Sequence, residues 1–169
     1  MIDIVVTLGT EFNKPKVLDD SPIVKVTLDG TKIAANVDVK NAATGSTTTT
    51  AASVVTASET ATPTTITTTK GSFTPAENAD KKADPEKNAI SRFSCIAIPQ
   101  TVGANTFKVS LMTAGKRYEW TSAEPVELKS GYRYTLKLSM GNDVVLLKGG
   151  GITATPWTEI TSDKPLETD

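Results

Sequence analysis

The chain has 169 residues, and 18 lysines and arginines nearly balance 19 aspartates and glutamates, giving a formal charge of -1 and an isoelectric point near 5.6. This balance excludes the strongly basic surface of a nucleic-acid-binding domain, so no nucleic-acid partner is expected. Histidine is absent, which excludes Ser-His-Asp and Cys-His catalysis and imidazole ligands for zinc. We therefore expect no enzymatic activity, no catalytic residue, no metal site and no cofactor.

The composition favours β-structure in one domain. Threonine alone accounts for 28 residues, and β-branched residues fit the half-buried surface of a strand. No stretch long enough for a core helix shows the 3.6-residue period of an amphipathic helix. We predict one all-β domain over residues 1–157, followed by a polar tail over 158–169.

The first quarter of the chain contains two candidate strand regions. Residues 2–8 alternate between apolar and polar side chains, as a half-buried strand does. Further on, Asp29-Gly30 separates two alternating runs, and this dipeptide is a strong signal for a two-residue hairpin turn. The predicted hairpin pairs Leu28 with Thr31 and Val26 with Ile33.

A threonine-rich segment follows. Of the 26 residues from 44 to 69, 13 are threonine and only Glu59 is charged, a composition typical of a loop. Short strands are predicted around 53–55 and 66–69, and a solvated loop over 75–88. We expect residues 44–88 to form a loop-rich insertion. A mucin-like glycosylated stalk over residues 44–69 is the less favoured alternative, because Pro63 is the only proline there and the chain has no Asn-x-Ser/Thr sequence.

The second half carries the clearer strand signals. Residues 90–98 are apolar at both alternation phases, which favours a strand covered on both faces, and Cys95 within it is predicted to be a packing residue. Residues 107–111 and 118–120 predict a hairpin, and residues 132–140 the cleanest half-buried strand. In total, about seven to nine strands at spacings near ten residues predict an antiparallel β-sandwich.

Two groups of side chains are candidates for function. Glu119, Glu124 and Glu127 lie close in sequence, but proximity does not establish the geometry of a glycosidase acid pair. Four aromatic side chains are candidate ligand contacts, with core or cross-strand packing as the favoured alternative: Tyr118, Trp120, Tyr132 and Tyr134.

Four motifs in a fixed order carry a resemblance to a known family. They are Phe93-Ser94-Cys95-Ile96-Ala97-Ile98-Pro99-Gln100-Thr101-Val102, Gly115-Lys116-Arg117-Tyr118-Glu119-Trp120, Leu128-Lys129-Ser130-Gly131-Tyr132-Arg133-Tyr134-Thr135-Leu136, and a closing Ile152 to Trp157. Over residues 89–157 the chain resembles the C-terminal domain of fimbrillin-family proteins, the type V pilins and related surface proteins of Bacteroidales. The first half of the chain is compatible with this resemblance.

The resemblance implies a transthyretin-like β-sandwich and a structural or accessory subunit of cell-surface fimbriae. It implies export as a lipoprotein to the outer membrane, with the signal upstream of this chain. The implied partners are other fimbrial subunits, joined by strand exchange, together with a host or bacterial surface protein or glycan. In that exchange a protease removes the first strand of the N-terminal domain, and a C-terminal segment of a neighbouring subunit fills the exposed groove.

The last apolar segment is the candidate assembly strand: Ile152, Thr153, Ala154, Thr155, Pro156 and Trp157. Two roles are open for it, a fixed structural strand or a donor that swings out to a neighbour, and the fixed strand is favoured. The tail beyond it has only Ile160 and Leu166 as aliphatic residues, too few for a good donor. The alternative function is a secreted carbohydrate- or protein-binding β-sandwich module.

Overall fold

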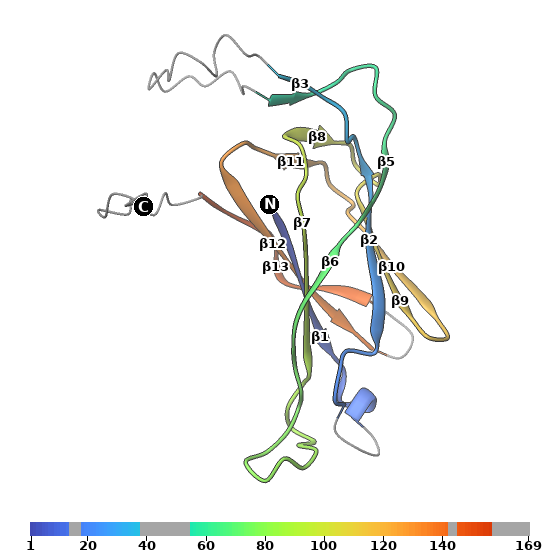
Figure 1. Ribbon diagram of the computed structural model, residues 1–169, viewed down its shortest axis with the longest axis vertical. Coiled ribbons are helices and arrows are strands. Elements are labelled where there is room, and N and C mark those ends of the chain that lie inside the picture. Colours follow the sequence, from blue (N-terminus) through green and yellow to red (C-terminus); the bar gives the residue numbers. More distant parts are fainter. Residues whose placement is uncertain (14–17, 38–54, 142–144, 157–169) are drawn as a thin grey trace, which may run out of the picture.

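A computed structural model of the chain describes residues 1–13, 18–37, 55–141 and 145–156 (Figure 1). These residues contain strands and one short 3-10 helix, with no α-helix among them, so the all-β prediction is confirmed. The elements are β1 (Ile2–Leu8), η1 (Thr10–Asn13), β2 (Ile23–Thr31), β3 (Ala35–Val37), β4 (Val55–Ala57), β5 (Thr64–Thr67), β6 (Thr69–Thr74), β7 (Ile90–Cys95), β8 (Gln100–Val102), β9 (Lys108–Thr113), β10 (Arg117–Thr121), β11 (Val126–Leu128), β12 (Tyr132–Met140) and β13 (Val145–Pro156).

Two main sheets form a β-sandwich. One has the strand order β13-β12-β1-β7-β6 and the other β10-β9-β2-β5, while β8 pairs with β11 and β3 with β4 in two small sheets. The buried side chains of both main sheets join in one hydrophobic core. The described part of the chain has thirteen strands, more than the predicted seven to nine, because several strands have only three or four residues and carry little sequence signal.

Strand β1 lies in the middle of the five-stranded sheet. It pairs antiparallel with β7 and parallel with β12, so that Ile4 stands between Phe93 and Leu136. All other named strand pairs of the described residues are antiparallel, as predicted. A parallel pair needs a long crossover connection, which the intervening chain between Leu8 and Tyr132 supplies.

The predicted Asp29-Gly30 hairpin is wrong. Strand β2 continues through both residues and pairs with β9 on one side and β5 on the other. Gly30 has a φ of +89° and lies at an irregularity in the β2–β5 register. A glycine at positive φ serves a bulge as well as a turn, which explains the misreading. Ile33, predicted to pair inward with Val26, is 60% exposed.

Replacing Gly30 with alanine is expected to destabilise the fold more than the same change at Gly131. Both residues have positive φ, which costs a non-glycine residue about 1–2 kcal/mol. At Gly30 the added Cβ would also lie 2.1 Å from the Thr106 carbonyl oxygen, whereas at Gly131 nothing lies within 4 Å. Urea unfolding of both variants measures the difference, and equal losses would contradict the bulge geometry.

The threonine-rich segment contributes strands to both main sheets. The short strand predicted around 66–69 is confirmed, as β5 followed after Thr68 by β6. Figure 1 shows β5 and β6 as one long ribbon that crosses from the four-stranded sheet to the five-stranded sheet. A strand that changes sheets closes one side of a sandwich. The predicted strand at 53–55 begins only at Val55 in the structure, and residues 38–54 lie outside the described part.

Strand β7 differs from its prediction at one end. It has neighbours on both sides within the sheet, and Phe93 is buried, but Ile96 just beyond it is 83% exposed. The expectation that both faces are covered is therefore wrong, since only the inner face packs on the core. By contrast, the predicted 107–120 hairpin and 132–140 strand are confirmed as β9–β10 and β12.

Candidate functional site

The first strand fills a slot in the middle of the five-stranded sheet. Its four inward side chains, Ile2, Ile4, Val6 and Leu8, are at most 1% exposed. Alternate residues of a strand point to the same face, so these four enter the core together as one row. Because β7 and β12 pair along its two sides, β1 supplies hydrogen bonds to both neighbours at once.

Backbone contacts fix both ends of β1. At the start, the Tyr134 amide donates to the Met1 carbonyl at 2.9 Å. At the far end, the Leu8 amide donates to the Ala89 carbonyl at 2.8 Å, and the Asn88 side-chain amide donates to the Leu8 carbonyl at 2.7 Å. The slot is thus defined by hydrogen bonds from both neighbouring strands and by the four aliphatic positions, a geometry that one extended segment fills.

The predicted assembly strand lies at the edge of the same sheet. Residues 152–156 belong to β13, which pairs with β12 and places Ile152 opposite Leu136. Ile152 is partly buried, while residues 153–156 are exposed. The structure holds this segment as an edge strand, the favoured arrangement, and its role in assembly stays a prediction. Trp157 and the tail 158–169 lie outside the described residues.

An apolar groove lies beside the edge strands of the two sheets. Strands β10 and β13 form these edges and contact each other. Beside them lies a cavity of about 560 Å³, lined among others by Trp120, Val126, Tyr134 and Ile152. The side of the sandwich opposite the β5–β6 crossing is therefore hollowed.

The four candidate aromatic residues do not share one surface. Trp120 and Tyr134 both line the groove beside β13, but Tyr132 lines a separate hollow next to Gln100. Tyr118 is only 7% exposed, and the Lys116 ammonium lies 5.1 Å from its ring centroid. A ligand role for these residues stays a prediction: Trp120 and Tyr134 line one groove, and the ring centroids of Tyr132 and Tyr134 lie 6.4 Å apart.

Packing explains the positions of these rings. The ring of Trp120 meets Phe107 edge to face, with centroids 6.4 Å apart and planes at 78°. The Tyr134 hydroxyl accepts a hydrogen bond from the Lys129 amide at 2.6 Å. Buried tyrosine and tryptophan commonly combine such apolar contacts with one polar partner.

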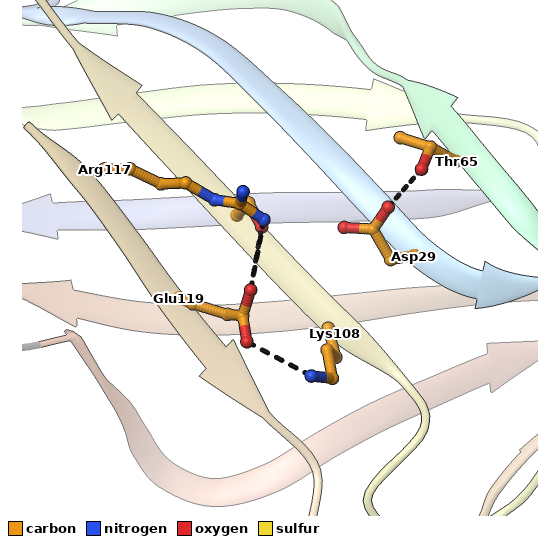
Figure 2. Close-up of polar contacts among 6 residues, drawn as sticks. Asp29, Thr65, Lys108, Arg117 and Glu119 are labelled. Atoms are coloured by element: carbon orange, nitrogen blue, oxygen red, sulfur yellow. Dashed lines mark hydrogen bonds and ion pairs between the residues drawn. The ribbon is translucent and has the colours of Figure 1, made fainter.

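Glu119, one of the three glutamates considered as glycosidase acids, forms ion pairs with two cations. Figure 2 shows Glu119 between Lys108, at 3.3 Å, and Arg117, at 3.1 Å. Arg117 also donates to the Ser110 hydroxyl at 2.9 Å. These contacts tie β9 to β10 on the outer face of the four-stranded sheet, and nearby Asp29 accepts from Thr65 across the β2–β5 pair. The arrangement is a cross-strand ion-pair network.

The single cysteine packs against the core, as predicted. Burial raises the pKa of the Cys95 thiol to about 11. Folding therefore favours the protonated thiol, and this contribution to stability is present below pH 9 and is lost as the pH rises from about 9 to 11. Neighbouring strands thus keep the sulfur in its less nucleophilic form.

Alkylation of Cys95 at pH 8 is expected to be about two orders of magnitude slower in the folded chain than in urea, because the thiolate is the reactive form. Iodoacetamide labelling followed by mass spectrometry measures both rates. Equal rates in the folded and unfolded chain would contradict the burial of this thiol.

The described residues contain neither a metal-binding cluster nor a membrane-spanning helix. No group of three histidine, cysteine, aspartate or glutamate side chains is placed to hold a metal ion there. In the same part of the chain, no helix is both long and apolar enough to span a bilayer.

Comparisons with known proteins assign the family. Two solved structures, each described as a "putative cell adhesion protein", align with the chain. One is from Bacteroides ovatus, at 15% identity and a TM-score of 0.49, covering 92% of this chain and 45% of that one. The other is from Bacteroides uniformis, at 14% identity and a TM-score of 0.49, covering 93% of this chain and 50% of that one. The chain therefore spans about half the length of these structures.

No curated protein matches the chain. The family comparison is decisive: residues 3–157, which include all four motifs quoted above and both main sheets except Ile2, match the fimbrillin-like family. The chain belongs to the fimbrillin-like family.

Proposed function

We propose that the chain is a structural or accessory subunit of bacterial cell-surface fimbriae, exported to the outer membrane and joined to neighbouring subunits by strand exchange. Membership of the fimbrillin-like family supports the fimbrial role. The single structural observation that supports the exchange is the position of β1, which lies in the middle of a sheet and fills an apolar slot with its alternate side chains.

Loss of β1 would leave two kinds of unsatisfied group. The backbone N–H and C=O groups of β7 and β12 that face it would lose their partners, and an apolar slot would open to water. Burial of four aliphatic side chains stabilises the joint by roughly 1.5–3 kcal/mol for each, before ordering costs. A replacement strand from a neighbour recovers both the hydrogen bonds and the burial.

The same energetics explain why the slot needs to be emptied first. While β1 is in place, an incoming strand of similar sequence has to displace it. The hydrogen bonds that form then only replace those that are broken, so the exchange gains little free energy. Removal of β1 by a protease makes insertion strongly favourable. The neighbour's segment would then present apolar residues at alternate positions, matching Ile2, Ile4 and Val6.

The edge strand β13 is the second candidate for assembly. Its outer edge has no ladder partner among the described residues, so it offers a place for an added strand or, if it swings out, a donor strand. Withdrawal of β13 would uncover the edge of β12, including Leu136 and Leu138, which are now fully buried. Substitution of Ile152 by aspartate would then weaken assembly without affecting the β1 slot.

Isolation of surface fimbriae from cells that express a tagged full-length protein tests the proposal. The chain is expected in polymers larger than the single subunit. Recovery of the chain only as a monomer outside any polymer would contradict the fimbrial role.

A carbohydrate- or protein-binding module is the second candidate function. The groove of about 560 Å³ beside Trp120 and Tyr134 favours it, because sugars stack on aromatic rings in apolar clefts. Glycan-array binding by the isolated monomer that is lost on Trp120→Ala, with unfolding unchanged, would support this role. No binding above background would exclude it for the glycans tested.

A further inference from the structure

The outer face of the five-stranded sheet carries an excess of positive charge. Arg92 on β7, Arg133 on β12 and Lys137 on β12 point outward together with one acid, Asp3 on β1, so three cations accompany one carboxylate. The whole chain has a formal charge of -1. The excess on this face is therefore a local feature and not a reflection of the composition.

Two of these cations have no acidic partner within the part of the chain that the structure describes. Arg133 is paired with Asp3, which raises the pKa of the arginine. Arg92 donates only to the Thr74 hydroxyl at 3.5 Å, and Lys137 is exposed. Among the described residues, neither Arg92 nor Lys137 takes part in an ion pair.

The opposite sheet shows what a neutralised face looks like in this molecule. There, Glu119 accepts from both Lys108 and Arg117, so the cations of that network are compensated (Figure 2). The contrast distinguishes the cations of the β9–β10 network from Arg92 and Lys137, for which the described residues supply no carboxylate partner.

A shallow hollow of about 350 Å³ lies on the cationic face. Its lining includes Arg92, the ion pair of Arg133 with Asp3, Gly71, and the hydroxyl-bearing residues Ser72, Ser94 and Thr135. Gly71 contributes by its lack of a side chain, because a Cβ there would lie 3.1 Å from the Arg92 carbonyl oxygen. Arg92 is thus the one cationic side chain of this lining without a carboxylate partner among the described residues, and residues with hydroxyl groups lie beside it.

The spacing of the free cations suits an extended ligand. Val5 stands between Arg92 and Lys137, with one residue on each neighbouring strand paired to it. Since adjacent strands lie about 4.8 Å apart, the two cationic residues start about 10 Å from each other. A polymer that lies across the strands meets both of them.

We propose that this face binds an anionic polysaccharide, with Arg92 and Lys137 contacting its sulfate or carboxylate groups and the surrounding hydroxyls contacting its sugar hydroxyls. Arginine pairs with such anions through two parallel hydrogen bonds. An acidic peptide fits less well. The backbone groups of β1, β7 and β12 are already paired with one another, so the backbone of a peptide lying on this face would find no hydrogen-bond partners in the sheet. This inference does not depend on strand exchange.

Binding of the full-length chain to dextran sulfate, with neutral dextran of the same length as the control polymer, tests the proposal. Calorimetry at low salt is expected to show binding to dextran sulfate only, lost in 1 M NaCl because screening shortens the range of charge interactions to about 3 Å. The double variant R92Q/K137Q is expected to lose at least about tenfold in affinity for dextran sulfate, since two charge-assisted hydrogen bonds are removed.

The variant K25Q/K108Q is the matched control, because it makes the same change in net charge on the other sheet. It is expected to bind as the unmodified chain does. Equal weakening in both double variants would overturn the proposal, as would the absence of any binding to dextran sulfate. Competition by poly-glutamate as strong as that by dextran sulfate would also overturn it and would assign the face to acidic peptides.

Discussion

Replacement of Ile4 by alanine is expected to lower the free energy of unfolding by about 2–5 kcal/mol, because a buried aliphatic side chain is lost and a cavity remains. Ile4 has no exposed surface and lies between Phe93 and Leu136 in the central strand of the five-stranded sheet. Such a loss is a large share of the total stability of a domain of this size. Urea unfolding followed by circular dichroism measures it.

Ile96 provides the matched control for this change. The same isoleucine-to-alanine substitution there is expected to alter the free energy of unfolding by less than about 0.5 kcal/mol, because Ile96 is 83% exposed. Similar losses at the two positions would contradict the burial pattern, and in particular the placement of β1 inside the sheet.

Replacement of Phe107 by alanine is expected to cost about 3–5 kcal/mol, the range for a fully buried aromatic side chain. Phe107 has no exposed surface and packs edge to face against Trp120, so the change removes both core volume and a ring contact at the groove. Thermal unfolding measures the loss, and the near-ultraviolet signal of Trp120 is expected to change with it.

A control for Phe107 is Ile33, which is 60% exposed. Its replacement by alanine is expected to leave both the unfolding temperature and the tryptophan signal unchanged. A change of the tryptophan signal at Ile33 equal to that at Phe107 would mean that the ring of Trp120 does not depend on the Phe107 contact.

Alternation of apolar residues predicted the strands that have one buried face. In β12, Tyr134, Leu136, Leu138 and Met140 all face the core as their spacing indicates. The same reasoning failed at Ile96, which lies just beyond the end of β7 and points to solvent. The sequence pattern does not show where a strand ends, so it could not separate Ile96 from the buried residues of the strand. Short strands such as β8 and β11 have too few residues for alternation to show.

Features that depend on partners distant in the sequence were beyond prediction from local patterns. The direction of pairing between β1 and β12 is one example, since a parallel and an antiparallel neighbour require the same side chains. Gly30 is another, because positive φ is compatible with both a hairpin turn and a bulge. The motifs in fixed order after Phe93, and not the periodicity, indicated the family.

The candidate sites show the same division. Sequence reasoning named Ile152 and the aromatic residues one by one, but it did not foresee that Trp120 and Tyr134 line one groove. It also missed the slot that β1 fills, although the alternation of residues 2–8 was visible. The cationic face was hidden because Asp3, Arg92 and Lys137 meet only through the strand order β12-β1-β7.

Strand complementation tests the central claim most directly. A chain that lacks residues 1–9 is refolded with a synthetic peptide of those residues, and with a peptide in which Ile4 is replaced by aspartate. The native peptide is expected to bind the truncated chain and restore its cooperative unfolding, while the aspartate peptide fails because its charge would be buried in the slot. Equal rescue by both peptides, or a truncated chain that unfolds at the temperature of the full chain without any peptide, would contradict an exchangeable strand at this position.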